Sequence, residues 1–435
     1  MDDALAIAMM RSHLQAAGPV DVATLIGESS FTFSPLRGAP MTLARAKTAL
    51  AALEADGFAI VVGGSKWCAR FTWVRCNEVA RRQRRASYPV IDATSYLRFM
   101  AQWQGVHQEH SLSGRDRLAE VLHQLAGFEV AAGEWDHVLA SRVADYRPEW
   151  LDELCLSGEF TWARLSLRAG DDESSRGSAT PSAVTPVAFF PRRERREFQR
   201  AVRLANAPRV PEAGASRDVY DALSRGAAFR FDLPDLARRL PPEVDEGVWD
   251  LVARGLVHAD AFAAVRSLLR VSSRAATPAG RRKLRDVQRA SVNSGVGEGR
   301  WDVVASSDAP VERAELEELA ELVAVQLLER WGIVCFDLYE LEAFKVPWRE
   351  VLRALRRLEV RGEVIGARVV TGVAGEQFIH PRALALLREE RVDVEADLST
   401  YDPLNFSGLI VGDERIAKRS KARVHFANGE LTPAT

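Results

Sequence analysis

The residues best suited to do chemistry in this chain are short clusters of arginine and lysine. A guanidinium group is planar and donates two parallel hydrogen bonds, a geometry that matches the oxygens of a phosphate group. One such cluster alone is most often a solvated helix face, but five of them recur along the chain. They are Arg81, Arg82, Arg84 and Arg85; Arg192, Arg193, Arg195 and Arg196; Arg281, Arg282, Lys283 and Arg285; Arg353, Arg356, Arg357 and Arg361; and Lys418, Arg419, Lys421 and Arg423. We therefore expect these clusters to bind the phosphates of a nucleic acid.

The overall charge limits how such binding can work. The chain has 58 basic and 60 acidic residues, which gives a formal net charge of −2. Bulk positive charge is thus excluded as the source of affinity, and any attraction for phosphate must come from the local clusters.

Four segments that could position these clusters share the pattern apolar-x-x-Leu-x-x-x-Gly, followed by a strand-like stretch. The pattern ends at Gly57, Gly158, Gly255 and Gly362. Apolar residues three positions apart line one face of a helix, and a glycine four residues after the second is where a left-handed cap ends it. This is the junction between the recognition helix and the wing of a winged helix-turn-helix. Because four copies occur at nearly equal spacing, the sequence predicts a tandem array of winged helices.

The predicted fold class is α+β, mainly helical, with tandem winged helices and a small C-terminal antiparallel β-barrel. The expected units are a winged helix at 1–75, a helical segment with a second winged helix at 76–168, and a strand segment with a third at 184–270. A fourth winged helix is expected at 312–392, and a β-rich tail at 397–435 completes the barrel. The polar stretch 169–183 is expected to be a mobile loop or a domain boundary, and the basic stretch 271–311 is expected to be a linker.

Several segments resemble the C-terminal half of Lhr-type (large helicase-related) proteins. In the fourth repeat and the tail these are 327–334 (LLERWGIV), 347–350 (PWRE), 355–363 (LRRLEVRGE), 375–378 (GEQF) and 402–408 (DPLNFSG). Further upstream they are 99–106 (FMAQWQGV), 150–159 (WLDELCLSGE) and 249–257 (WDLVARGLV). The matches follow one another in the same order over nearly the whole chain, which makes the series far more specific than any one motif.

The resemblance implies tandem winged helices that follow a superfamily 2 helicase motor and end in a β-barrel. It also implies a more distant similarity to AlkZ-like winged-helix DNA glycosylases, and uracil-DNA glycosylase activity. No GxxxxGK[ST] motif occurs in this chain, and Gly63-Gly64-Ser65-Lys66 lacks the upstream Gly and the following Ser or Thr of a phosphate-binding loop. We expect no ATPase activity from this chain and no cofactor.

Glycosylase chemistry, if the resemblance extends to it, needs a flipped base and a polar group that positions water or stabilises the sugar cation. The preferred catalytic residues are Asp402 and Asn405, with Asn428 in reserve. The alternative is that Asp402-Pro403 only forms a turn and has no catalytic role. The resemblance implies an acidic residue in the terminal turn, where this chain has Asn428. The other polar candidates are Gln102, Gln104, Asp152, Glu153, Glu376 and Gln377.

Three functions compete at this point. The first is a DNA-binding repair module with candidate glycosylase activity. The second is a non-catalytic scaffold that binds single- or double-stranded DNA and joins a separately encoded helicase motor, or forms a homo-oligomer. The third is a transcription regulator, which seldom needs four winged helices.

The remaining expectations are absences. The four cysteines form no CxxC pair, no metal site is expected, and the start Met1-Asp2-Asp3 is no signal peptide. No apolar run approaches the length of a membrane span. We expect a cytoplasmic, nucleoid-associated protein.

Overall fold

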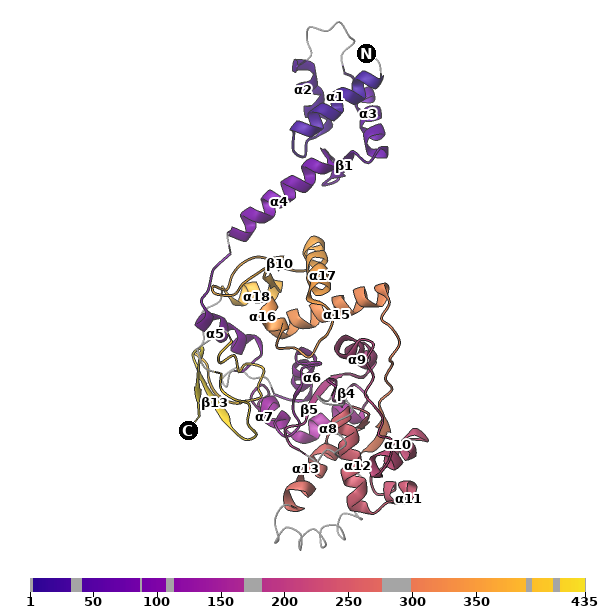
Figure 1. Cartoon of the computed structure of the whole chain (residues 1–435). Coiled ribbons are helices and arrows are strands. Elements are labelled where there is room, and N and C mark those ends of the chain that lie inside the picture. Colours follow the sequence, from indigo (N-terminus) through magenta and orange to yellow (C-terminus); the bar gives the residue numbers. More distant parts are fainter. Residues whose placement is uncertain are drawn as a thin grey trace. The chain divides into compact units, whose positions relative to one another are not determined.

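The computed structural model describes residues 3–32, 41–86, 88–106, 113–167, 182–275, 299–388, 393–409 and 415–434. The chain divides into two compact units, Met1–Tyr88 and Pro89–Thr435 (Figure 1). Among the described residues, no helix combines the length and the apolar character needed to cross a membrane.

Unit 1 contains one winged helix. Its helices are α1 (Asp3–Ala16), α2 (Val22–Thr32) and α3 (Leu43–Ala55), and its wing is the antiparallel pair β1 (Ala59–Val62) and β2 (Lys66–Ala69). Val20, which precedes α2, forms an isolated antiparallel bridge to Trp67 of β2. The strand β2 therefore lies between Val20 and β1. The helix α4 (Arg70–Ala86) follows β2 directly.

The second winged helix, in unit 2, repeats this order of elements. It consists of α6 (Arg115–Gln124), β3 (Val130–Ala131), α7 (Trp135–Ala140), α8 (Pro148–Leu156), β4 (Phe160–Ala163) and β5 (Pro186–Pro191). Its sheet has the strand order β3-β5-β4. The helix α5 (Ala93–Trp103) precedes it.

The third winged helix consists of α10 (Ala215–Ser224), β6 (Ala228–Phe229), α11 (Leu233–Ala237), α12 (Pro241–Arg254), β7 (Val257–Ala259) and β8 (Arg300–Val303). Its strand order is β6-β8-β7. The helix α13 (Ala263–Ala275) lies between the two wing strands in sequence, and the short helices η1 (Arg192–Glu194) and α9 (Arg195–Arg203) connect this winged helix to the second.

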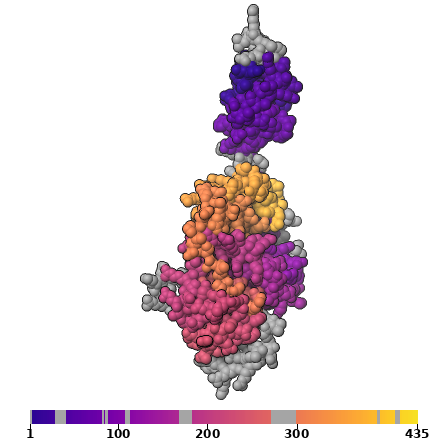
Figure 2. All heavy atoms as spheres, turned by 90° about the vertical axis from the view of Figure 1, so that its right-hand side faces the viewer, coloured from indigo at the N-terminus to yellow at the C-terminus, as the bar shows by residue number. Residues whose placement is uncertain are grey.

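The fourth winged helix consists of α15 (Arg313–Trp331), β9 (Ile333–Val334), α16 (Phe336–Tyr339), α17 (Trp348–Arg361), β10 (Ile365–Gly366) and β11 (Phe378–Ile379), with the strand order β10-β11-β9. It is followed by α18 (Pro381–Leu386). Figure 2 shows orange atoms, the colour of this winged helix, directly against the purple and magenta atoms of the second winged helix and of α9.

The predicted glycine junctions are confirmed. Gly57, Gly158, Gly255 and Gly362 follow α3, α8, α12 and α17, and their φ angles are 71°, 81°, 70° and 82°. A Cβ atom is sterically strained in this left-handed region, which explains why the pattern ends in glycine. Each glycine is followed within three residues by the first wing strand. The sequence therefore located all four recognition helices.

Neither the domain boundary considered at 169–183 nor the linker expected at 271–311 is found. The strand β5 pairs with β3 and β4 of the second winged helix, so the polar stretch before it interrupts one wing and does not separate two domains. Likewise β8, inside the expected linker 271–311, pairs with β6 and β7. In both cases a long segment joins the two strands of one wing, and sequence spacing alone cannot show that strands on either side of such a segment pair.

The C-terminal tail forms a three-stranded antiparallel sheet of β12 (Glu395–Ser399), β13 (Arg423–Ala427) and β14 (Glu430–Pro433), in the order β12-β13-β14. The predicted barrel is not confirmed, because the described residues of this region form no closed sheet. The two outer strands remain edges, and closure into a barrel needs more strands than three. The expected turn at Asn428-Gly429 joins β13 to β14, with φ angles of 50° and 88°.

Candidate functional site

The arginines of the predicted fourth cluster lie on the exposed face of the recognition helix α17. Arg353 and Arg356 are each 53% exposed, Arg357 is 43% exposed and Arg361 is 45% exposed. Leu355 and Leu358 on the opposite side are buried. This separation of faces is what a helix needs if it is to lie in a groove of a nucleic acid.

Each of these arginines has an acidic partner. Arg353 donates to both carboxylate oxygens of Glu350 at 2.7 and 2.8 Å, and this hydrogen bonding lowers the pKa of Glu350. Arg356 pairs with Glu376 of the wing. Arg357 and Arg361 lie 3.9 and 2.7 Å from carboxylate oxygens of Glu321 on α15. The basic helix face is therefore already neutralised by ion pairs, in which the arginines are exposed and Glu350 alone of the carboxylates is buried.

The second cluster lies where η1 leaves the sheet of the second winged helix. Arg192 is exposed and its Nη2 lies 3.5 Å from the carbonyl oxygen of Cys155, at the C-terminal end of the recognition helix α8. Arg193 is 80% exposed and forms an ion pair with its neighbour Glu194. Both guanidinium groups are within reach of a ligand at the surface.

The tail cluster is partly structural. Lys418, Arg419 and Lys421 are exposed. The backbone N–H of Arg419 donates to Thr400 Oγ1 at 2.9 Å, and that of Lys421 donates to the buried carboxylate of Glu134 at 2.7 Å. These backbone contacts fix the segment that precedes β13.

Two predicted clusters cannot be placed in the same way. The backbone of Arg81, Arg82, Arg84 and Arg85 belongs to α4, but their side chains lie outside the described part of the chain. Arg281, Arg282 and Lys283 lie entirely outside the described residues. All of these stay predictions.

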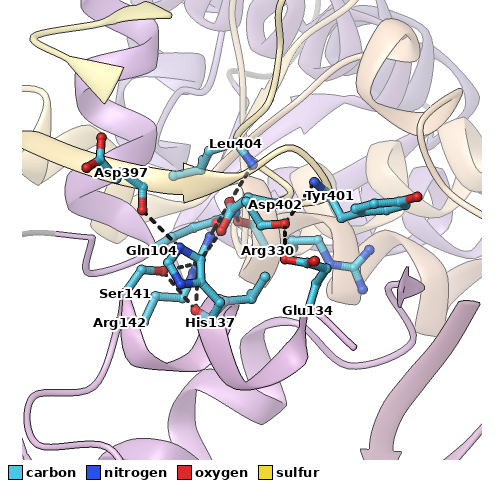
Figure 3. Close-up of polar contacts among 12 residues, drawn as sticks. Gln104, Glu134, His137, Ser141, Arg142, Arg330, Asp397, Tyr401, Asp402 and Leu404 are labelled. Carbon is cyan, nitrogen blue, oxygen red and sulfur yellow. Dashed lines mark hydrogen bonds and ion pairs between the residues drawn. The ribbon is translucent and has the colours of Figure 1, made fainter. Parts of the chain in front are cut away.

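Asp402, the preferred catalytic carboxylate, lies in a buried ion pair with Arg142. Both side chains are 0% exposed, and Arg142 Nη1 and Nη2 donate to the two carboxylate oxygens at 2.8 Å each. Arg142 Nη2 also donates to Gln104 Oε1 at 2.7 Å. The Asp402 carboxylate accepts a further hydrogen bond, from the backbone N–H of Leu404. Figure 3 shows Arg142 between Gln104 and Asp402.

Asn405 lies in a neighbouring buried network. Its Nδ2 donates to the carbonyl oxygen of Thr400 at 2.9 Å, and its Oδ1 accepts from Ser407 Oγ at 2.6 Å. Ser407 Oγ in turn accepts from the backbone N–H of Ile416. Asn405 thus holds two stretches of the tail together.

The reserve residue Asn428 fixes the tail to α5. Its Oδ1 accepts from the backbone N–H of Val394, and its carbonyl oxygen accepts from Arg98 Nε. A Cβ atom on the next residue, Gly429, would lie 2.2 Å from the carbonyl oxygen of Thr94. This turn therefore lies close against the backbone of α5.

The other polar candidates also have partners. Asp152 pairs with Arg266 at 2.7 Å, Gln377 binds the backbone N–H groups of Val369 and Val370, and Glu376 holds Arg356. Glu153 is exposed on α8 and Gln102 is half-buried on α5. Among the described residues, no group of three or more His, Cys, Asp or Glu side chains is arranged to hold a metal ion.

A buried histidine lies between the second and third winged helices. His258 Nδ1 is 3.2 Å from Thr161 Oγ1, and its Nε2 is 3.5 Å from Arg195 Nη1. Burial, aided by the positive charges of Arg195 and Arg192, lowers the pKa of His258 to about 4. The imidazole is therefore neutral in the folded protein at pH 7.

This histidine predicts an acid-sensitive fold. As pH falls from 6.5 to 4, the unfolded chain takes up a proton at this position and the folded chain does not, so the free energy of unfolding should fall by about 3 kcal/mol. Urea denaturation at a series of pH values measures this. The variant His258→Gln should show a shallower decrease over the same range, and an unchanged pH profile would contradict the assignment.

Comparison with known proteins gives the family of these domains. A family model described as "Large helicase-related protein, winged-helix domain" matches residues 91–182, and a second model with the same description matches residues 313–398. The chain carries winged-helix domains of the Lhr type.

Two curated Lhr proteins align with most of the chain. The "Lhr helicase/ probable uracil glycosylase" of Mycolicibacterium smegmatis is 26% identical over 401 residues, which is 86% of this chain and 25% of that protein. The "Lhr helicase/uracil glycosylase" of Escherichia coli is 27% identical over 361 residues, 75% of this chain and 22% of that protein. The chain thus spans about a quarter of the length of these Lhr proteins. The predicted resemblance is confirmed.

A solved structure, the DNA glycosylase AlkZ of Streptomyces sahachiroi, is also similar. It has a TM-score of 0.46 and 12% sequence identity, and the match covers 79% of this chain and 87% of that one.

Sequence reasoning missed the arginines that are buried in these Lhr-type domains. Arg142 follows the apolar run of α7, and Arg330 lies at the end of α15, where it pairs with buried Glu342. The one available signal was an arginine within an otherwise apolar stretch, since such a residue is seldom buried without a partner. The sequence could not identify the partner, because Asp402 is 260 residues away from Arg142.

Proposed function

We propose that this chain is a DNA-binding repair module that removes uracil from DNA without hydrolysing ATP. The observation that carries the proposal is the colinear similarity of 86% of the chain to a protein named as an Lhr helicase and probable uracil glycosylase. The fold supports it, because four winged helices with one common strand order provide four recognition helices. Such a protein would act at the nucleoid.

The recognition helix α17 is the proposed centre of DNA binding. Exposed ion pairs such as Arg356–Glu376 contribute only about 0–1 kcal/mol each, so their arginines can exchange a carboxylate for a phosphate at small cost. A bidentate arginine–phosphate contact also releases counterions from the DNA. We include the exposed residues Arg192, Arg193, Lys418, Arg419 and Lys421 in the interface, together with Arg81, Arg82, Arg84, Arg85, Arg281, Arg282 and Lys283.

The proposed catalytic region lies where α5, the second winged helix, the fourth winged helix and the tail meet. Gln104, Arg142, Arg330 and Asp402 come from these four parts. A flipped nucleotide needs a pocket walled by more than one rigid element, and this junction brings several such elements together. Asp402 would stabilise the sugar cation and Asn405 would hydrogen-bond the base edge, with Asn428 as the reserve.

The geometry sets a condition on that role. Both carboxylate oxygens of Asp402 accept hydrogen bonds from Arg142. To act on a sugar, the carboxylate must exchange at least one of these bonds for the substrate. The catalytic proposal therefore includes an opening of the Arg142–Asp402 pair when DNA is bound.

The test uses duplex and single-stranded DNA that contain one uracil. The purified chain, without ATP and in the presence of EDTA, should bind both and should produce alkali-sensitive sites at the uracil. Control DNA with thymine at that position should stay intact. Binding without uracil removal would reject the glycosylase and leave a DNA-binding scaffold for a separate helicase motor, whereas no DNA binding at all would reject the whole proposal.

A further inference from the structure

A small cavity lies between α9 and the chain that follows β8. Its volume is about 210 Å³, and its wall includes Arg195, Arg196, Gln199 and Arg203 from α9 and Ser306 and Ser307 from the opposite side. Residues 195, 199 and 203 are spaced four apart, so they share one face of the helix. The cavity is smaller than the pockets of about 300–1,000 Å³ that hold drug-sized ligands, but it has room for a small polyatomic ion.

Two buried side chains in this wall have donors without a partner. Gln199 is 5% exposed and Arg203 is 3% exposed, and neither Gln199 Nε2 nor Arg203 Nη1 has a hydrogen-bond acceptor among the described residues. The rest of the Arg203 guanidinium is well bonded, since Nε donates to the carbonyl oxygen of Leu165 and Nη2 to those of Arg164 and Gly255. A buried donor that lacks an acceptor is costly. Each donor therefore lacks an acceptor, and because both atoms are shielded from solvent, an acceptor in the cavity reaches them only when the two side chains turn toward it.

The charges around the cavity indicate what kind of acceptor is missing. Arg200, also in the wall, is neutralised by a bidentate pair with Glu315 at 2.8 and 2.9 Å. Arg195, by contrast, contacts the neutral ring of His258. Burial lowers the pKa of Arg203 to about 10, so this side chain still carries its positive charge at pH 7. The wall has more positive than negative charge, which favours an oxyanion.

We propose that this cavity binds one phosphate group of a nucleic-acid backbone. Arg195, Arg196 and Arg203 supply the charge, and Gln199 Nε2 and the two serine hydroxyls supply neutral donors. The exposed Arg192 and Arg193 belong to η1, which precedes α9 directly, so a bound strand can pass along η1 toward the cavity. This inference rests on the proposed DNA binding, and adds a contact between the second and third winged helices that no recognition helix provides.

The first arm of the test measures oxyanion binding by the full chain. Inorganic phosphate should raise the Tm saturably, relative to chloride at the same ionic strength. Gln199→Glu has nearly the same shape but places a carboxylate in the cavity, and Arg196→Gln removes one charge at its edge. Both variants should lose the phosphate-dependent rise in Tm. Arg217→Gln, which alters an exposed arginine of α10 that pairs with Asp221, should keep it.

The second arm measures DNA binding. Arg196→Gln should weaken affinity about 10-fold and reduce the slope of log Kobs against log salt by about 0.9, the value for one lost phosphate contact. Gln199→Glu should also weaken binding, and Arg217→Gln should not.

The two arms separate failure of the cavity from failure of the proposed function. A parent chain that binds DNA, with no phosphate effect and with unchanged affinity in both cavity variants, would overturn the cavity assignment alone. A chain that binds phosphate but no DNA would overturn both the nucleic-acid occupant and the proposed function, and would leave a site for a free oxyanion.

Discussion

Replacing Asp402 with Asn should lower the free energy of unfolding by about 3–5 kcal/mol, which is the usual cost of breaking a buried ion pair by removing one partner. The substitution keeps the shape of the side chain, but it leaves the positive charge of fully buried Arg142 without its carboxylate. It also places an NH₂ group against the donors of Arg142. Chemical denaturation of the full chain, followed by circular dichroism, measures the change.

The tail itself offers a matched control. Asp397→Asn is the same substitution on a carboxylate that is 66% exposed and pairs with His425 at 2.9 Å, and an exposed pair contributes about 1 kcal/mol or less. The double variant Arg142→Met/Asp402→Leu should recover much of the lost stability, because it removes both charges together. A single Asp402→Asn variant as stable as the parent would contradict the structural role of the pair.

The same variant tests the catalytic proposal when uracil release is measured at a temperature where it remains folded. If Asp402 stabilises the sugar cation, the rate should fall at least about 100-fold, because one electrostatic contact to a transition state is typically worth a few kcal/mol. DNA affinity should change little. Full activity in folded Asp402→Asn protein would move the catalytic assignment to Asn428.

The second large effect is expected at the recognition helix α17. Replacing Arg353, Arg356 and Arg357 with Ala should weaken DNA binding and reduce the slope of log Kobs against log salt by about 2.7, since each lost phosphate contact accounts for about 0.9 on duplex DNA. Fluorescence anisotropy at a series of salt concentrations measures both quantities. The fold should persist, because the pairs of Arg356 and Arg357 are exposed, and the buried carboxylate of Glu350 keeps its ion pair with Arg349 when Arg353 is replaced.

A charge-matched variant separates this local effect from a change in net charge. Arg11, Arg209 and Arg225 are exposed arginines that lie on α1, on the segment after α9 and at the end of α10, so none of them belongs to a recognition helix. Replacing these three with Ala changes the net charge by the same amount and should leave the salt slope near that of the parent. Equal slopes in the two triple variants would remove α17 from the DNA interface.

The local features of this protein could be predicted from its sequence. The four glycines that end the recognition helices were found because a left-handed cap and an apolar face are properties of about ten consecutive residues. The terminal turn at Asn428 is likewise local, and it joins β13 to β14. The Lhr resemblance was also carried by short runs of neighbouring residues.

Features that depend on distant partners were decided only by the tertiary structure. The strand β5 joined the second winged helix across a long insertion, and three tail strands formed an open sheet where a barrel was expected. Asp402 and Arg142, 260 residues apart, became one buried pair. The physical reason is that a helix or a turn is stabilised within its own segment. A buried charge or hydrogen-bond donor, by contrast, needs a partner that tertiary packing brings next to it. The spacing of residues along the chain does not specify which residue that partner is.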